Sequence, residues 1–130
     1  MISAILLAAG KSKRLKGENK LIKNFKGKPL INHILSSLIK SKVNKIFIVV
    51  GYQNQKIKKI AYKNKKITFV TNLNYKKGIS SSINSGLKRI SKKNIGFLIT
   101  HGDMPLISKT ILNTLCSALK NKDKEIFVPV

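Results

Sequence analysis

Short continuous apolar runs alternate with longer amphipathic stretches along this chain. Continuous apolar runs of this length are typical of parallel strands that are covered on both faces. Each run therefore predicts one buried strand. The predicted strands are Ile2–Leu7, Ile46–Val50, Ile67–Val70, Ile95–Thr100 and Ile126–Val130.

Apolar residues at helical spacing predict a helix after each of the first four strands. The first helix follows a turn at Gly27 and ends near Ser41, and the second is a polar surface helix over Gln53–Lys63. The alternation predicts a three-layer α/β domain with a Rossmann-like, mostly parallel sheet of about five strands. The predicted stripes are Leu30, Ile31, Ile34, Leu35, Leu38 and Ile39; Ile57, Ile60 and Ala61; Ile79, Ile83, Leu87 and Ile90; and Ile111, Leu112, Leu115 and Leu119.

Length and charge limit the classes of protein. A chain of 130 residues that is 42% hydrophobic is expected to form one domain, residues 1–130, with one core. The net charge of +23 suggests a nucleic-acid binder, but all of the 27 basic residues except Arg14 and Arg89 are lysines spread along the chain, and there is no Trp. Nucleic-acid binders cluster their charge and add arginine or aromatic residues. We therefore expect a positive surface that steers anionic ligands, and no nucleic-acid partner.

Cysteine, histidine and the N-terminus add little chemistry. The single Cys116 lies on an apolar helical stripe, which indicates a buried structural thiol. His33 and His101 lack metal-ligand spacing with each other or with Cys116, so we interpret both as structural or solvated. The apolar start of the chain is too short for a membrane span and lacks a basic leader. We expect a cytoplasmic protein without a membrane partner.

The loop after the first strand has the composition of a phosphate site. Ala8, Ala9 and Gly10 carry no bulk, so backbone N–H groups there can close around an anion. The Walker pattern is absent because the next glycine, Gly17, is followed by Glu18, and no G-x-G-x-x-G occurs. A simple strand-to-helix turn is the alternative interpretation. The basic side chains of this loop are Lys11, Lys13, Arg14 and Lys20.

Two later segments also carry candidate chemistry. Ser80–Ser82 stand at the predicted start of the third helix, where hydroxyls commonly cap free N–H groups. Asp103 follows the fourth strand, where α/β folds bind ligands and where a carboxylate can hold Mg²⁺ beside substrate phosphates. The alternative for Asp103 is a turn residue that caps the next helix.

Together these segments resemble a known family. The stretch LLAAGKSKRLKGENKL is similar to the signature loop of the MobA-like NTP transferases, the molybdenum cofactor guanylyl- and cytidylyltransferases, although Arg14–Lys20 is one residue longer than usual and Leu15 replaces Met. GISSSINSGL at 78–87 is similar to a segment of the cytidylyltransferase branch. GDMP at 102–105 is the third motif of the resemblance, and the three motifs follow in the family's order. The residues of the loop that match the family pattern are Ala8, Ala9, Gly10, Ser12, Arg14 and Lys20.

The resemblance implies roles for particular residues. The backbone of Leu7–Gly10 would contact the nucleotide, Arg14 and Lys20 would hold the triphosphate as catalytic cations, and Asp103 would bind catalytic Mg²⁺. The remaining nucleotide-binding positions would be Ser12, Gly78, Ser81 and Ser82.

The implied reaction is transfer of CMP from CTP to a phosphorylated acceptor, molybdopterin, with release of pyrophosphate. Ala9, where guanylyl-transferring relatives carry glycine, and the pair Ser81 and Ser82 favour CTP over GTP. A homodimer or a molybdoenzyme partner fits the same resemblance.

Other functions fit the sequence as well. The acceptor could be a sugar phosphate, the chain could be an inactive nucleotide-binding remnant, or it could be a basic nucleic-acid binder whose affinity falls steeply with salt. Family members continue beyond the strand that corresponds to Ile126–Val130 and carry a further acidic metal ligand there. We therefore expect a C-terminally truncated chain, for which nucleotide binding is better supported than turnover.

Overall fold

The computed structural model describes residues 1–10 and 19–121. The chain alternates between strands and helices, as the hydrophobic pattern predicts. In chain order the elements are β1 (Ile2–Ala8), the 3₁₀ helix η1 (Lys20–Ile22), β2 (Asn24–Phe25), β3 (Lys28–Pro29), α1 (Leu30–Lys40), β4 (Lys45–Val50), α2 (Asn54–Ile60), β5 (Ile67–Thr71), the 3₁₀ helix η2 (Tyr75–Lys77), α3 (Ile79–Leu87), β6 (Gly96–His101) and α4 (Lys109–Asn121).

The central sheet is four-stranded and parallel, in the order β5-β4-β1-β6. Strand β1 lies between two partners, so that Leu6 is opposite Ile48 on one side and Thr100 on the other. The predicted α/β fold is therefore confirmed. The predicted fifth strand, Ile126–Val130, lies outside the described residues.

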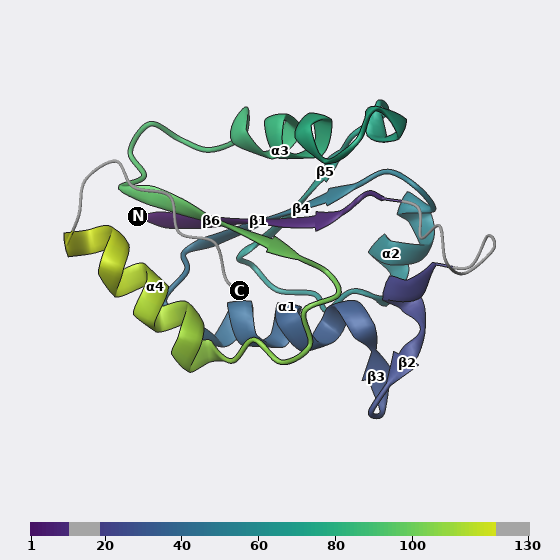
Figure 1. Cartoon of the computed structure of the whole chain (residues 1–130), viewed down its shortest axis with the longest axis horizontal. Coiled ribbons are helices and arrows are strands. Elements are labelled where there is room, and N and C mark those ends of the chain that lie inside the picture. The colour runs from purple at the N-terminus through teal and green to yellow at the C-terminus, as the bar shows by residue number, and fades with distance from the viewer. Residues whose placement is uncertain (11–18, 122–130) are drawn as a thin grey trace.

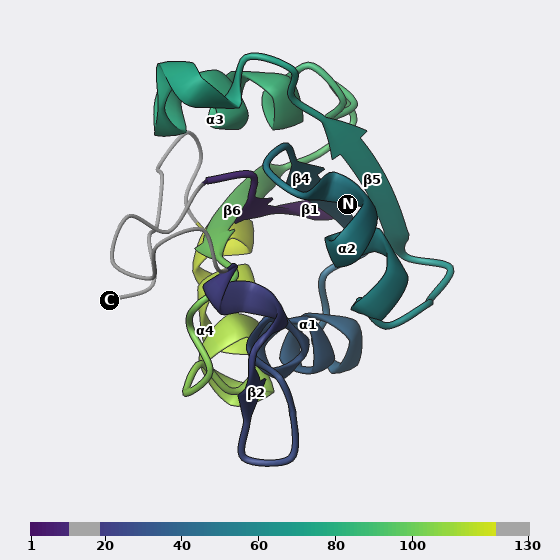
Figure 2. The same ribbon diagram turned by 90° about the vertical axis from the view of Figure 1, so that its right-hand side faces the viewer.

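Helices cover both faces of this sheet (Figures 1 and 2). On β1, Ala4 and Leu6 point into the larger core cluster, which contains the buried side chains of α1 and α4. Ile5 and Leu7 point to the opposite face, into a cluster that includes Ile83 of α3. Because successive strand residues alternate between faces, every second residue of β1 packs against the same layer of helices, and the residues between them pack against the other layer.

Helix α2 is shorter than the predicted span Gln53–Lys63 and ends at Ile60. The side chain of Asn32 on α1 explains this end. Its amide nitrogen donates to the carbonyl of Ile60 at 2.9 Å, and its amide oxygen accepts from the N–H of Tyr62 at 3.1 Å. These bonds bind the backbone that would otherwise continue the helix.

The buried face of helix α3 is centred on small residues and is rotated from the predicted stripe, of which Ile83 and Ile90 still pack against the core. Ile79 is 58% exposed, whereas Ser82 and Gly86 are buried. A Cβ atom at Gly86 would lie only 2.8 Å from the Cγ2 atom of Ile5 on β1. The missing side chain thus allows α3 to lie close to the sheet, and this close approach determines which face is buried.

Two of the residues interpreted as structural, His33 and Cys116, have structural surroundings. The His33 ring nitrogen Nε2 lies 2.6 Å from the carbonyl oxygen of Phe25, and the two rings meet edge to face. Cys116 is buried on α4, and this burial raises the pKa of its thiol. No helix within residues 1–10 and 19–121 is both long enough and apolar enough to cross a membrane.

The packing of α3 gives a first prediction. We expect Gly86→Ala to destabilise the domain by about 1 to 2 kcal/mol, because overpacking against Ile5 costs about 1 to 3 kcal/mol while alanine recovers up to about 1 kcal/mol of helix propensity. Urea unfolding measures the difference. Ser80→Ala on the exposed side of the same helix is the matched control and should change the stability by less than about 0.5 kcal/mol. A stabilised Gly86→Ala variant would contradict this account of the packing.

Candidate active site

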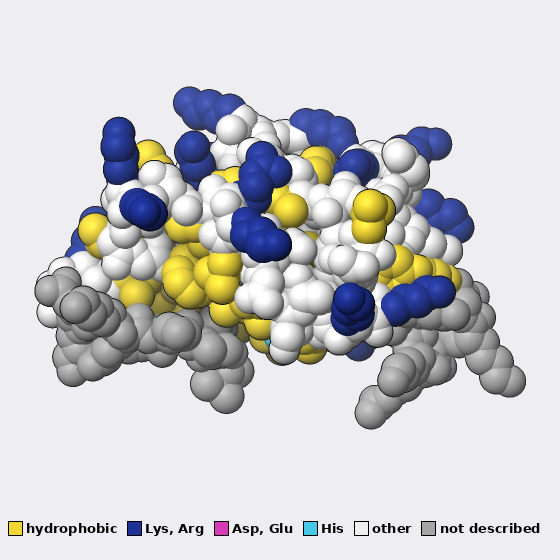
Figure 3. Space-filling model, turned by 90° about the horizontal axis from the view of Figure 1, so that it is seen from above, with side chains coloured by type: hydrophobic (Ala, Val, Ile, Leu, Met, Phe, Trp, Pro, Cys, Tyr) yellow, Lys and Arg dark blue, Asp and Glu magenta, His cyan; other side chains and the backbone are white. Residues whose placement is uncertain are grey.

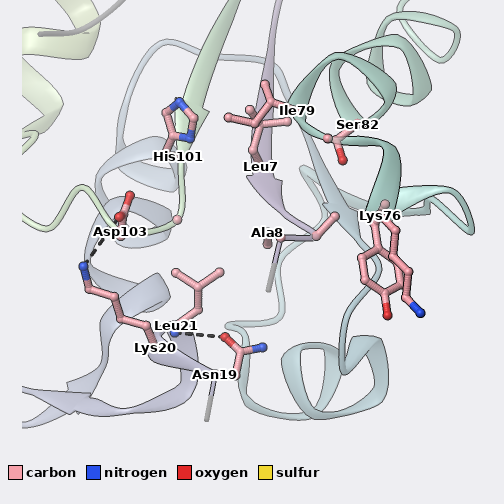
Figure 4. Close-up of a pocket in the computed structure, with 15 residues that line it drawn as sticks. Leu7, Ala8, Asn19, Lys20, Leu21, Lys76, Ile79, Ser82, His101 and Asp103 are labelled. Carbon is pink, nitrogen blue, oxygen red and sulfur yellow. Dashed lines mark hydrogen bonds and ion pairs between the residues drawn. The ribbon is translucent and has the colours of Figure 1, made fainter. Parts of the chain in front are cut away.

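A pocket of about 870 Å³ opens at the carboxyl edge of the sheet, beyond the ends of β1 and β6. After β1 the chain adds β4 and β5 on one side, and β6 returns to the other side of β1. The strand order reverses at this point, which is where open α/β sheets bind ligands. The residues that line the pocket are Leu7, Ala8, Ala9, Gly10, Asn19, Lys20, Leu21, Tyr75, Lys76, Gly78, Ile79, Ser82, His101, Gly102 and Asp103 (Figure 4).

The carboxyl ends of β1 and β6 form the base of the pocket. The backbone N–H of Gly102 donates to the carbonyl of Leu7 at 3.0 Å, which extends the pairing of the two strands into their loops. A Cβ atom at Gly102 would lie 3.0 Å from the side chain of Leu21 and 3.4 Å from that same carbonyl. The absence of a side chain lets the β6 loop and η1 approach each other, and Asp103 follows directly.

Lys20 and Asp103 meet across the pocket. Their Nζ and Oδ2 atoms are 3.7 Å apart, and the side chains are 54% and 46% exposed. Lys20 is held on η1, where the amide oxygen of Asn19 accepts from the N–H of Leu21 at 3.0 Å. Figure 4 shows both interactions.

Asp103 does not cap the helix that follows it. The N–H of Ile111 in the first turn of α4 donates to the hydroxyl of Ser108 at 3.3 Å. The carboxylate of Asp103 instead has Lys20 as its ion-pair partner. Because both groups are half exposed, their attraction is screened by water and is worth less than about 1 kcal/mol. An anion could therefore take the place of Asp103 beside Lys20, and a cation the place of Lys20 beside Asp103, with little loss of free energy.

The opposite wall comes from η2 and the start of α3. Ser82 is 5% exposed and lines the pocket, whereas Ser81 does not. The predicted serine caps are absent at this helix, since its N-cap is Gly78 and no side chain bonds to the first turn. The start of α3 therefore keeps free N–H groups beside the pocket, and such groups favour anions.

The structure brings together most of the predicted site residues that it describes. Ser12 and Arg14 lie outside the described residues. Ser81 lies behind the pocket wall, where its hydroxyl donates to the carbonyls of Asn74 and Gly78 at 3.0 and 2.9 Å. The predicted residues that line the pocket are Leu7, Ala8, Ala9, Gly10, Lys20, Gly78, Ser82 and Asp103.

Sequence reasoning missed part of the lining. His101, which we interpreted as structural or solvated, lines the pocket at the end of β6. Its position at the end of a strand, two residues before Asp103, was the available signal. The other lining residues that the sequence did not indicate are Asn19, Leu21, Tyr75, Lys76, Ile79 and Gly102.

One carboxylate is available to a metal ion here. Within residues 1–10 and 19–121 no group of three or more His, Cys, Asp or Glu side chains is placed to hold a metal. Zinc and other soft metals need such groups. Mg²⁺ requires only one or two carboxylates when substrate phosphates complete its shell, so Asp103 fits this ion.

Comparison with known proteins identifies the family. The profile of the family described as "MobA-like NTP transferase domain" matches residues 4–130. This chain belongs to the MobA-like NTP transferase family. Its members are nucleotidyltransferases, and the pocket therefore lies in a nucleotidyltransferase fold.

Relatives of this MobA-like domain are longer proteins. The bifunctional protein GlmU of Francisella tularensis is 29% identical over 94% of this chain and 26% of its own length. The crystal structure of Rv0371c from Mycobacterium tuberculosis has a TM-score of 0.78 at 18% identity, covering 89% of this chain and 58% of that one. A second structure of Rv0371c is a complex with manganese, with a TM-score of 0.71 at 16% identity.

A third fold neighbour has a nucleotide in its structure. CMP:2-keto-3-deoxy-manno-octonic acid synthetase, complexed with CTP, has a TM-score of 0.72 at 16% identity over 93% of this chain and 48% of that one. The MobA-like domain thus spans about a quarter of the matched GlmU and about half of these solved chains.

The exposed ion pair gives a second prediction. We expect Asp103→Ala to change the free energy of unfolding by less than about 1 kcal/mol, because a half-exposed pair contributes little to stability. Chemical denaturation of the variant beside the wild type measures this difference. A loss of several kcal/mol would mean that the pair holds the fold together, and would leave loss of activity in this variant without diagnostic value.

Proposed function

We propose that this domain binds a nucleoside triphosphate with Mg²⁺ in the pocket and transfers CMP from CTP to a phosphorylated acceptor, molybdopterin. The observation that carries the proposal is the meeting of Lys20 and Asp103, 3.7 Å apart, at the point where the strand order reverses. The proposal assigns Lys20, on η1, to the phosphates and Asp103, after β6, to the metal ion. Family membership across residues 4–130 supports the same chemistry.

The triphosphate has several partners in this proposal. Lys20 contacts its oxygens, and the backbone N–H groups of Leu7–Gly10, which line the pocket, contact the nucleotide. Ser12 and Arg14, outside the described residues, complete the loop. Asp103 would hold Mg²⁺, which would neutralise charge on the phosphate oxygens.

The reaction is a displacement at phosphorus. An oxygen of the acceptor phosphate attacks the α-phosphorus of CTP and forms the new P–O bond. The bond from this phosphorus to the oxygen bridging to the β-phosphate breaks, and pyrophosphate leaves with the electron pair. Lys20 lowers the barrier by stabilising negative charge on the phosphates as it moves toward the leaving group. No side chain of the protein needs to act as a nucleophile.

CTP is the proposed nucleotide for two reasons. Ala9 and Ser82, which the family resemblance associates with cytidylyl transfer, both line the pocket. The fold also accommodates CTP in the octonic acid synthetase. The manganese complex of Rv0371c supports a divalent cation in the same fold.

A sugar-type acceptor is the second candidate. The name of the synthetase that resembles this fold specifies a sugar acid as the partner of CMP. Because the chain spans only part of its relatives, activity of these 130 residues by themselves is also part of the proposal, and binding without transfer is the alternative.

Nucleotide binding is tested by calorimetric titration with CTP, GTP and ATP, each with and without Mg²⁺. We expect CTP to bind most tightly and to need Mg²⁺ for this binding. In Asp103→Ala we expect nucleotide binding to be the same with and without Mg²⁺, and we expect the transfer reaction to be lost. Pyrophosphate release with CTP and molybdopterin, compared with CTP and sugar phosphates, then identifies the acceptor. Binding that is equal with and without Mg²⁺ in the wild type, or normal turnover by Asp103→Ala, would disprove the metal role.

Lys20 can be tested against an otherwise equivalent lysine. Lys20→Gln should weaken CTP binding by about tenfold, because a charge-assisted bond to phosphate contributes about 1.5 kcal/mol or more. Lys65→Gln removes the same charge from an exposed lysine before the amino end of β5, on the edge of the sheet opposite the pocket. The control should bind CTP like the wild type. Equal weakening in both variants would show that Lys20 acts only through the net charge of +23.

A further inference from the structure

The amide of Asn72 links the end of β5 to the pocket wall. Asn72 is 4% exposed and follows the last residue of β5, Thr71. Its Oδ1 atom accepts a hydrogen bond from the backbone N–H of Asn74 at 2.9 Å. Its Nδ2 atom donates to the hydroxyl oxygens of Ser81 at 2.9 Å and Ser82 at 3.0 Å. Every polar atom of this side chain is therefore in use.

The orientation of this amide follows from its backbone partner. A backbone N–H can only donate, so the atom of Asn72 that faces Asn74 must be the oxygen. The NH₂ group then faces the two serines, and each of its hydrogens is directed to one hydroxyl. Both hydroxyl oxygens are consequently acceptors toward Asn72, and each serine can use its own hydrogen elsewhere.

The two serines differ in where that hydrogen goes. Ser81 donates to the carbonyls of Asn74 and Gly78, within the loop. The O–H of Ser82 donates no hydrogen bond to the described part of the chain, although the residue is only 5% exposed. Ser82 lines the pocket on the wall formed by α3, across from Leu7 and Ala8 (Figure 4). Its donor is thus available to a bound ligand.

We propose that Asn72 is a positioning residue that directs the Ser82 O–H toward the pocket, and that this donor favours cytosine over guanine. The inference rests on the proposed function and deepens it. Cytosine has two acceptors on its Watson–Crick edge, N3 and O2, whereas guanine has two donors there, N1–H and N2–H. A donor directed at this edge meets an acceptor at N3 or O2 of cytosine but only at O6 of guanine. Opposite N1–H or N2–H of guanine the hydroxyl loses the bond that it donates and can accept only through its remaining lone pair.

Asn72→Asp tests the polarity with little change of shape. One carboxylate oxygen can still accept from the N–H of Asn74, while the other replaces the NH₂ group and accepts from the serine hydroxyls. The Ser82 hydrogen then points away from the pocket. We expect the ratio of the dissociation constants for GTP and CTP to fall by about tenfold, the effect of one misdirected hydrogen bond.

The added negative charge weakens all triphosphates alike and cancels in this ratio. Asn74→Asp is the matched control, because it adds the same charge to the same loop while Asn74 takes part in the network through its backbone N–H and carbonyl. Its ratio should equal that of the wild type.

Ser82→Ala provides an independent test that does not depend on how the Asn72→Asp variant folds. It removes the donor and should also lower the ratio, whereas Ser80→Ala at an exposed position of the same helix should not. In the double variant that combines Asn72→Asp with Ser82→Ala, the ratio should equal that of Ser82→Ala alone, since Asn72 acts through this hydroxyl.

The outcomes separate the two proposals. If the wild type prefers CTP and this preference is unchanged in Asn72→Asp and in Ser82→Ala, the role of Asn72 is overturned and the proposed function stands. A wild type that binds GTP as well as CTP, or better, also overturns this inference. Absence of any nucleotide binding by the wild type overturns both.

Discussion

The pairing of β1 with a parallel strand on each side is the constraint on which this structure depends. All residues of β1 from Ile2 to Ala8 are buried. Its backbone is bonded to β4 and to β6, and its side chains alternate between two helical layers. The strand therefore has no freedom to shift in register. This rigidity fixes the carboxyl ends of β1 and β6 relative to each other, and these two strand ends form the base of the pocket.

The close approach of α3 to β1 connects core packing with the chemistry of the pocket wall. Gly86 lets the helix lie against Ile5, and the same helical face then presents Ser82 one turn earlier. A larger residue at position 86 would lift this helix from the sheet. The buried hydroxyl beside the pocket is thus a consequence of close packing, and the amide of Asn72 gives it a defined direction.

Charge acts at two ranges in this molecule. Lysine and arginine side chains are spread over the face that carries α3, without a single basic patch (Figure 3). Such a surface attracts anions in general and distinguishes little among them. Asp103 is the one acidic residue within residues 1–10 and 19–121, and its position at the pocket gives the site a local feature that the remaining surface lacks. Selection therefore has to come from short-range contacts within the pocket.

The amino-acid sequence by itself determined the four strands of the central sheet, the α-helices between them and the position of Asp103 beyond a strand end, because apolar runs and helical stripes are local patterns. It also indicated the loop that begins at Leu7–Gly10, because small residues beside basic ones after a buried strand can surround an anion. It did not indicate the short hairpin of β2 and β3. The tertiary structure decided where the buried face of α3 is centred. Ile83 and Ile90 of the predicted stripe pack against the core, but the close approach of Gly86 to Ile5 turns the helix so that Ser82 is buried and Ile79 is exposed.

The tertiary structure also decided which serine belongs to the pocket. Ser81 and Ser82 are neighbours in sequence and have identical chemistry, but a helix turns by about 100° per residue. One hydroxyl is therefore bonded within the loop while the other lines the cavity. The partner that orients both, Asn72, comes from another element. No local pattern specifies that contact, because it exists only once β5 and α3 have packed together.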